Sequence, residues 1–429
     1  MTHAALLRGA GFRRLFTARV LSQLADGIFQ GSLAGTVFFN PEHETDPRRA
    51  AAGFLVLYLP YSVVSPFAGV ILDRWRRQRS LLASCLLRLP LVALVAALIA
   101  TRATAAVWSL PFFVAALLVL GVSRFFIAAA GAALPHVVEE DRLVSANALA
   151  GTCGTVAAFA AGILVLVARS VLPAGAGTDA GLALASAAGY ALAAVALTRF
   201  RSTDLGPDIV AATSPMRSEA ARVVREMADG MRHLRTRPAA VRGLAAMTAY
   251  RVCMGAMTLD AVLLYRNAFS DVHGLLPGGQ TGLAEMVAAS AVGILAGAAV
   301  TPRITERIGK PAWVAALLIA AGVVVGGLGP SYRPLAFLLA GLVVGAVGQG
   351  VKICIDTLVQ EVVDDEFRGR VFAFYDALFN MAFAFGAVAA AVSVPTSGRS
   401  LVVLGATAGL FIVAGVAYGA AERSRVEAA

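Results

Sequence analysis

The stretch GVILDRWRRQRSL, from Gly69 to Leu81, ends one long apolar segment and begins the next. An apolar run of membrane-spanning length ends at Leu72, and Asp73 and four arginines follow it directly. A short basic loop after an apolar run is typical of the cytoplasmic side of a membrane. The stretch therefore predicts a membrane protein and orients one of its loops. In the simplest interpretation these arginines only set the topology.

Apolar residues dominate the whole chain. Of its 429 residues, 59% are hydrophobic and 14% are charged, which excludes an ordinary soluble domain. One span needs about 20 apolar residues. The sequence predicts twelve spans, at roughly 14–39, 51–72, 80–100, 106–133, 142–168, 181–200, 241–267, 281–301, 312–329, 334–362, 370–394 and 400–420.

The distribution of charge orients these spans. The net charge is +10, and with the N-terminus inside, 24 of the 36 Lys and Arg residues lie in cytoplasmic segments and seven in external ones. This bias predicts a multi-pass protein of the plasma membrane with cytoplasmic N- and C-termini, and it argues against a nucleic-acid partner. The start of the chain lacks a cleavage site, so we expect the first span to be retained.

Motifs of common catalytic and metal sites are missing from the sequence. The four cysteines fall inside spans without CxxC spacing, and the five histidines lie in loops or at span ends. The chain contains no H-E-x-x-H, no G-x-S-x-G and no G-x-x-x-x-G-K-[ST]. We expect no enzyme activity, no metal site, no cofactor and no use of ATP.

Polar residues inside the spans are the candidate site residues, because ionisable groups in a membrane are costly and usually functional. Gln23, Asp26 and Gln30 are spaced to share one face of the first span, and we expect that face to look into a cavity. Asp26 either exchanges a proton or is a structural partner of Arg19 or Arg124. The predicted substrate and ion pathway consists of Gln23, Asp26, Gln30, Arg124, Arg251, Lys352, Asp356 and Asp376.

Lys352 and Asp356 carry opposite charges four residues apart in the tenth span. They therefore share a helical face, and we expect them to pair in the low-dielectric interior. Breaking such a buried pair would cost about 3 to 5 kcal/mol.

The chain repeats itself. HVVEEDRL at 136–143 resembles EVVDDEFR at 361–368, and AAFAAG at 157–162 resembles MAFAFG at 381–386, at nearly the same offset along the chain. We expect an N-terminal six-helix bundle at 1–200, a cytoplasmic linker at 201–240 and a C-terminal six-helix bundle at 241–429. Apolar residues at helical spacing in the linker predict an amphipathic surface helix. A disordered basic linker is the alternative.

The opening stretch resembles a motif of the major facilitator superfamily, G-x-L-a-D-R-x-G-R-R/K-x-x-L, found between its second and third helices. Gly69, Asp73, Arg74, Arg77 and Leu81 match this motif, whereas Arg76 and Gln78 depart from it. The resemblance implies an all-α membrane fold of twelve helices in two pseudo-symmetric six-helix bundles. It also implies that Gly69, Asp73, Arg74 and Arg77 form a conformational latch.

Shorter matches resemble the drug and siderophore exporters of that superfamily, such as enterobactin-exporter-like and macrolide-efflux-like proteins. They are RGRVF at 368–372, the first span, and Leu120 four residues before Arg124. The G-P pair of antiporters is absent at Ala161 and Gly162, so the fifth span does not indicate proton antiport. This resemblance implies a monomeric secondary transporter, in contact with membrane lipid, that exports a small amphipathic molecule and is driven by either a proton gradient, with protons as the coupling ion, or a substrate gradient. A lysophospholipid or lipid flippase of the same fold, and a membrane scaffold or sensor that transports nothing, remain alternatives.

Overall fold

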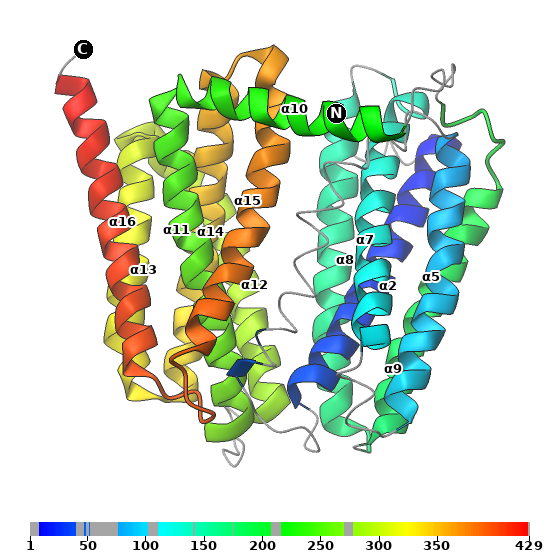
Figure 1. The fold of residues 1–429 in the computed structure, drawn as a ribbon, viewed down its shortest axis with the longest axis horizontal. Helices are drawn as coiled ribbons and strands as arrows, with labels where there is room; N and C mark the ends of the chain where they lie inside the picture. The colour runs from blue at the N-terminus through cyan, green and yellow to red at the C-terminus, as the bar shows by residue number, and fades with distance from the viewer. Residues whose placement is uncertain are drawn as a thin grey trace. The chain divides into compact units, whose positions relative to one another are not determined.

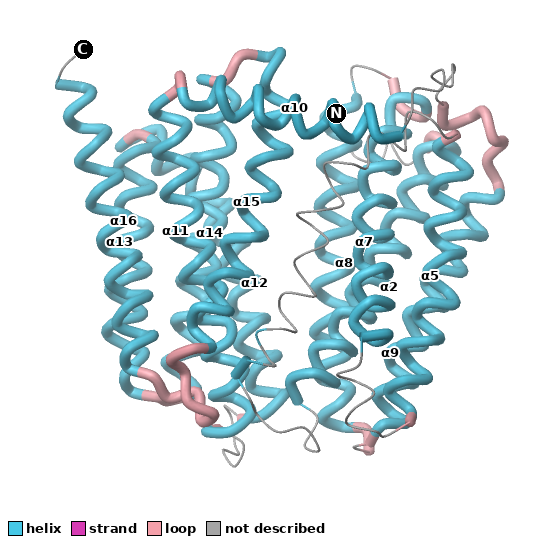
Figure 2. Tube along the Cα trace, viewed as in Figure 1, coloured by secondary structure: helices cyan, strands magenta, loops and turns pink. Residues whose placement is uncertain are grey.

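The computed structural model describes residues 8–39, 47–48, 51, 76–101, 110–139, 142–173, 175–206, 216–269 and 278–427. Across these residues the chain is almost entirely helical and contains no strand (Figures 1 and 2). It divides into two compact units, and among the described helices the boundary lies within α10, between Val223 and Val224. We call these units the N-terminal half and the C-terminal half.

Five long helices build the described part of the N-terminal half. They are α2 (Ala10–Phe39), α5 (Arg77–Ala100), α7 (Leu110–Ala133), α8 (Leu143–Val171) and α9 (Ala176–Thr198), with the short 3-10 helix η2 (Leu134–His136) after α7. They carry the predicted first, third, fourth, fifth and sixth spans. Apart from Ala51, the second predicted span lies outside the described residues.

Six long helices build the described part of the C-terminal half. They are α11 (Pro238–Leu263), α12 (Gly279–Ile308), α13 (Lys310–Leu328), α14 (Pro334–Val362), α15 (Asp365–Ala391) and α16 (Leu401–Glu427). The π-helix η4 (Leu264–Ala268) continues α11, and the 3-10 helix η5 (Gly329–Ser331) follows α13. The prediction for the tenth span coincides with α14.

Ten of the described helices are long and apolar enough to cross a membrane. The polar side chains of α2 keep it outside this set, although its 30 residues exceed the length of a span. The prediction of an all-helical integral membrane fold is confirmed.

The two halves repeat the same packing pattern. In the N-terminal half α2 packs against α7, α8 and α9, while α5 packs against α7 and α9. In the C-terminal half α11 packs against α14, α15 and α16, while α13 packs against α14 and α16. The contacts of α2, α5, α7, α8 and α9 in the N-terminal half are therefore repeated by α11, α13, α14, α15 and α16 in the C-terminal half.

Small residues allow the closest of these crossings. A Cβ atom added to Gly27 on α2 would collide with the carbonyl oxygen of Ala158 on α8. At the equivalent crossing, a Cβ atom added to Gly255 on α11 would collide with the carbonyl oxygen of Phe383 on α15. Because either added methyl group would meet backbone, these glycines fix how closely the helices approach. Ala158 and Phe383 lie in the repeated peptides AAFAAG and MAFAFG, so the same segment of the repeat makes a close helix contact in both halves.

The linker contains the helix α10 (Met216–Arg235). Leu234 at its C-terminal end is buried in the hydrophobic core of the C-terminal half. There His233 stacks on Phe367 with ring centroids 4.3 Å apart, and Arg237 donates two hydrogen bonds to Asp364 at 2.8 and 3.0 Å. The linker residues Met216–Arg235 therefore form a helix, as the amphipathic pattern predicts, and its C-terminal end is tied to the turn between α14 and α15.

Candidate functional site

A buried ion pair lies at the centre of the N-terminal half. Asp26 on α2 and Arg88 on α5 are 3.2 Å apart between Oδ1 and Nη1, and their side chains are 6% and 0% exposed. Ser123 on α7 donates to the same Oδ1 at 2.6 Å, and Tyr190 on α9 donates to it at 2.8 Å. Four helices therefore converge on one carboxylate.

The guanidinium of Arg88, like the carboxylate of Asp26, has several interaction partners. Its Nε donates to the carbonyl oxygen of Ser84 at 2.9 Å, and Nη1 also reaches the hydroxyl of Ser123 at 3.2 Å. The rings of Tyr190 and Phe126 lie 4.1 and 5.1 Å from the guanidinium carbon. A buried charge needs such compensation, and here hydrogen bonds, aromatic faces and an opposite charge supply it together.

Arg88 is the ion-pair partner of Asp26 that the sequence reasoning missed, because it offered Arg19 or Arg124 instead. A usable signal was present: Asp26 is the only acidic residue in the predicted spans of the N-terminal half, and Arg88 lies deep within an apolar span. Arg19 instead donates to Gln23 at 3.4 Å, and Arg124 is partly exposed on α7.

The polar residues of α2 do not all point the same way. Gln23 is buried and packs against α8, where a Cβ atom added to Gly154 would collide with its Oε1. Asp26 contacts α5, α7 and α9 instead, and Gln30 is partly buried. The predicted common face therefore separates into a helix contact at Gln23 and an ion-pair cluster at Asp26.

The C-terminal half brings four predicted residues together around Tyr375 on α15. Lys352 and Asp356 form the expected ion pair on α14, and Lys352 Nζ lies 5.7 Å from the centre of the Tyr375 ring. The charges of Asp356, Asp376 and Arg251 all act on the Tyr375 hydroxyl. We call Arg251, Lys352, Asp356, Tyr375 and Asp376 the C-terminal charged group.

Two of these residues differ from expectation in their surroundings. The side chains of Lys352 and Asp356 are 41% and 26% exposed, so the pair is only partly buried within the protein, whereas a fully buried pair was expected. The expected penalty of about 3 to 5 kcal/mol applies to a fully buried pair. Arg251 on α11 lies against the ring of Phe379 at 3.8 Å, and its Nε donates to the carbonyl oxygen of Phe379 at 3.1 Å.

Only part of the predicted latch lies within the described residues: Gly69, Asp73 and Arg74 are outside them. Arg77 begins α5, where its backbone nitrogen donates to the carbonyl oxygen of Gly206 at 2.9 Å. Its Nη1 lies 2.8 Å from Nε2 of His136, in the turn between α7 and α8. Arg77 therefore connects three chain segments at one end of the N-terminal half.

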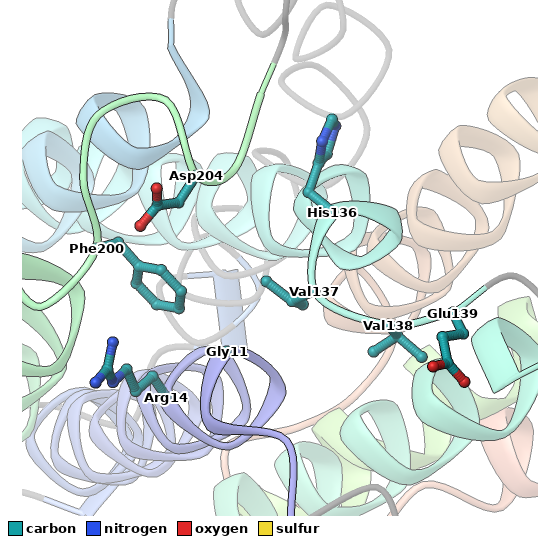
Figure 3. A pocket seen from close by; sticks show the side chains of 8 residues that line it. All are labelled: Gly11, Arg14, His136, Val137, Val138, Glu139, Phe200 and Asp204. Atoms are coloured by element: carbon teal, nitrogen blue, oxygen red, sulfur yellow. The ribbon is translucent and has the colours of Figure 1, made fainter.

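An open surface pocket of about 510 Å³ lies at the same end of this half (Figure 3). Its lining combines charged, apolar and aromatic side chains: Gly11, Arg14, His136, Val137, Val138, Glu139, Phe200 and Asp204. Arg14 donates to the carbonyl oxygen of Arg199 at 3.2 Å, which joins the start of α2 to the end of α9. Across the described ranges, no three His, Cys, Asp or Glu side chains are grouped so that they could hold a metal ion.

The fold and these charges define a class: polytopic α-helical membrane proteins with two structural repeats and ionisable groups inside each repeat. The sequence model of the Major Facilitator Superfamily matches residues 15–387, and the chain belongs to that superfamily. Uncharacterized MFS-type transporters of Mycobacterium bovis and Mycobacterium tuberculosis are each 34% identical over 390 residues, covering 91% of this chain and 86% of theirs.

Solved structures share the fold at low sequence identity. The peptide transporter POT in complex with sulfate superposes with a TM-score of 0.71 at 14% identity, covering 99% of this chain and 98% of that one. The nucleoside transporter NupG gives a TM-score of 0.62 at 14% identity, covering 96% and 98%. Fold and relatives together support membrane transport of a small molecule by a multi-pass transporter.

Proposed function

We propose that this protein is a secondary active transporter that exports small amphipathic compounds from the cell by alternating access. Superfamily membership supports transport, and the resemblance to drug and siderophore exporters favours export over uptake. Protons moving in the opposite direction are the proposed energy source, because the sequence contains no nucleotide-binding motif.

The C-terminal charged group is the observation that supports an amphipathic substrate. Its Lys352–Asp356 pair is partly exposed and lies beside the ring of Tyr375, while Arg251 lies against Phe379 and Phe383. Ionic groups beside aromatic faces suit a ligand that carries both a charge and an apolar body. A partly exposed ion pair can also exchange partners with a ligand more easily than a fully desolvated pair can.

Reconstituted vesicles provide the test. Purified protein would be assayed with radiolabelled cationic, anionic and zwitterionic amphiphiles and with lysophospholipids, with and without an imposed pH gradient. We expect directional movement of one amphiphile class that requires protein and stops when an ionophore collapses the gradient. Protein-free vesicles are the control for leakage.

Two outcomes would contradict the proposal in different ways. Movement of lysophospholipid between leaflets, with none of the soluble amphiphiles moved, would favour a flippase. A folded protein that moves none of the compounds would favour a scaffold or sensor.

A further inference from the structure

Arg77 and His136 form a contact that depends on the charge of the imidazole. Arg77 is the first residue of α5, and His136 is the last residue of η2. Nη1 of Arg77 lies 2.8 Å from Nε2 of His136. A guanidinium has only donors and keeps its charge at physiological pH, so Nε2 must be the acceptor. Only a neutral histidine offers such an acceptor, because the protonated ring carries hydrogen on both nitrogens.

The backbone around this contact is closely packed. The backbone nitrogen of Arg77 donates to the carbonyl oxygen of Gly206 at 2.9 Å, in the segment that follows α9. Gly206 has φ 68°, a conformation that favours glycine, and a Cβ atom added there would lie 2.5 Å from Nε2 of His136. Arg76 donates to the hydroxyl of Ser202 in the same segment at 2.8 Å. We call the contacts of Arg77 with His136 and Gly206 the N-terminal tie.

The C-terminal half has a contact at the equivalent place. Lys310 is the first residue of α13, the counterpart of α5, and its Nζ donates to Oε2 of Glu361 at 2.6 Å. Glu361 aligns with His136 in the repeated sequences HVVEEDRL and EVVDDEFR. In each half, therefore, a cation at the start of the helix donates to the residue that opens the repeated sequence.

The two acceptors differ in how they respond to pH. A glutamate side chain stays ionised well below neutral pH, so the contact of Lys310 has an acceptor throughout the physiological range. A histidine side chain changes charge between about pH 5 and 8. When pH falls through that range, His136 loses its acceptor nitrogen and becomes a second cation beside Arg77. The N-terminal tie is therefore favoured at the alkaline end of the range and lost at the acidic end.

The surface pocket gives water access to His136, because the imidazole is exposed and belongs to the lining. The other charged side chains of the lining are Arg14 on α2, Glu139 between η2 and α8, and Asp204 after α9. In the view of Figure 3, His136 lies between the two carboxylates. A protonated imidazole is repelled by Arg77 and attracted by these carboxylates.

Both carboxylates can accept a further cation. Glu139 pairs with Arg142 at 3.4 Å, but its side chain remains 72% exposed, and such surface pairs contribute little. Asp204 accepts a hydrogen bond from the backbone nitrogen of Arg201 at 2.8 Å through Oδ2. A carboxylate has about four acceptor positions, so this bond leaves others available.

We propose that the N-terminal tie is a pH-sensitive switch that regulates the protein. Neutral His136 holds the start of α5 to the segment after α9, and protonated His136 releases it. The step is the transfer of one proton from water to Nε2, with loss of the hydrogen bond from Arg77. By the predicted topology this face is cytoplasmic, so the switch responds to acidification of the cytoplasm. Its effect on transport rests on the proposed function, whereas the switch itself does not.

Hydrogen–deuterium exchange of the full chain in lipid vesicles tests the switch, because the backbone N–H of Arg77 is part of the tie. Mass spectrometry would follow the peptides that span Arg77 at about pH 6 and about pH 8, with labelling times scaled for the intrinsic dependence of exchange on pH. We expect the scaled exchange to be about three- to tenfold faster at the acidic pH, as for loss of one hydrogen bond from a charged donor. Equal scaled exchange at both pH values would overturn the proposal.

Replacements of His136 separate the switch from a general effect of acid. His136→Glu supplies the acceptor of the other half, and His136→Gln supplies a milder, neutral acceptor, so both should give slow exchange at both pH values. His136→Lys places a lasting cation there and should give fast exchange at both. A wild-type pH difference that persists in the Glu and Gln variants would assign the effect to another group and overturn the proposal.

His233 in the C-terminal half provides the matched control. Its Nε2 lies 3.6 Å from the carboxylate of Asp364, a partner that a protonated imidazole can keep. His233→Gln should therefore leave the pH difference at Arg77 unchanged. Loss of that difference in His233→Gln, with His136→Gln behaving as the wild type, would place the switch in the wrong half.

Transport tests the regulatory consequence separately. If a substrate is found, its exchange without a gradient should change about threefold or more in the wild type between the two pH values, and His136→Glu should not respond. An equal response of both proteins would overturn the regulatory role while leaving the exporter proposal intact. If the wild type transports nothing, the exporter proposal fails, and hydrogen–deuterium exchange still decides whether the tie opens on protonation.

Discussion

Equivalent positions in the two halves carry opposite charges. Asp26 on α2 and Arg251 on α11 are related by the same offset that relates HVVEEDRL to EVVDDEFR in the repeated sequences. Asp26 is locked among Arg88, Ser123 and Tyr190, whereas Arg251 lies against two aromatic faces of α15. The repeat therefore preserves the helix packing while its charges have diverged.

The difference suggests a division of labour. The ion pair in the N-terminal half is fully desolvated and joins four helices, so moving it would cost most of its stabilisation. The pair in the C-terminal half is partly exposed, and its residues are neighbours on one helix. We therefore infer that the first cluster holds its half rigid and that the C-terminal charged group contacts the substrate. The predictions below test this comparison.

Among the predicted substitutions, removal of Arg88 should reduce the free energy of unfolding most. Arg88→Met leaves Asp26 buried beside two hydroxyls without its cation, which should cost about 3 to 5 kcal/mol and lower the yield of folded protein. The double variant with Asp26→Leu removes both charges and should recover most of the loss. Fluorescence-detected size-exclusion chromatography after heating measures how much folded protein the single and the double variant retain. A single variant as heat-stable as the wild type would show that the pair does not stabilise this half.

Removal of Arg251 should reduce the free energy of unfolding by less, although Arg251 occupies the repeat position equivalent to that of Asp26. Arg251→Met loses the aromatic contacts and one hydrogen bond, which together contribute about 1 to 2 kcal/mol. Arg303→Gln on the exposed surface of α12 is the matched control and should leave the melting temperature unchanged. If Arg251→Met were as damaging as Arg88→Met, the proposed contrast between the halves would be lost.

Features within one helix could be predicted from the sequence, whereas contacts between helices could not. Apolar run length predicted α14 to the residue, because Pro334 fixes its start and polar residues follow its end. The i,i+4 spacing predicted the pairing of Lys352 with Asp356, since both lie on one helix. Contacts between helices were harder: periodicity assigns a face to Asp26 but not the helix that covers it, so Arg88 was missed. Burial was misjudged at Lys352 because depth along a span does not indicate which side of the helix is exposed.

The third prediction concerns the double variant Lys352→Met with Asp356→Leu. Because the pair is partly exposed, its removal should change the free energy of unfolding by about 1 kcal/mol or less. Transport should nevertheless be lost if these charges exchange partners with the substrate. Full transport by the stable double variant would reduce the pair to a structural role.

The smallest change in stability is expected at the two basic loops that open the third helix of each half. The N-terminal loop contains Asp73 and Arg77, whereas the corresponding stretch TPRITERIGKP at 301–311 keeps its cations without an aspartate at the same spacing. In the C-terminal half Lys310 pairs with Glu361 at the exposed start of α13. Asp73→Asn and Lys310→Gln are therefore matched substitutions at equivalent loops, and each should alter stability by about 0.5 kcal/mol or less.

Their effects on transport should differ if the latch exists. A hydrogen bond between Asp73 and a charged or backbone donor, made in one access state only, is worth about 1.5 kcal/mol and would change the ratio of the two states roughly tenfold. Asp73→Asn should therefore slow transport several-fold at normal expression, whereas Lys310→Gln should transport at the wild-type rate. Equal rates for both variants would mean that the arginines of the N-terminal loop only orient the chain in the membrane, since a charge that sets topology during insertion has no further part in the cycle.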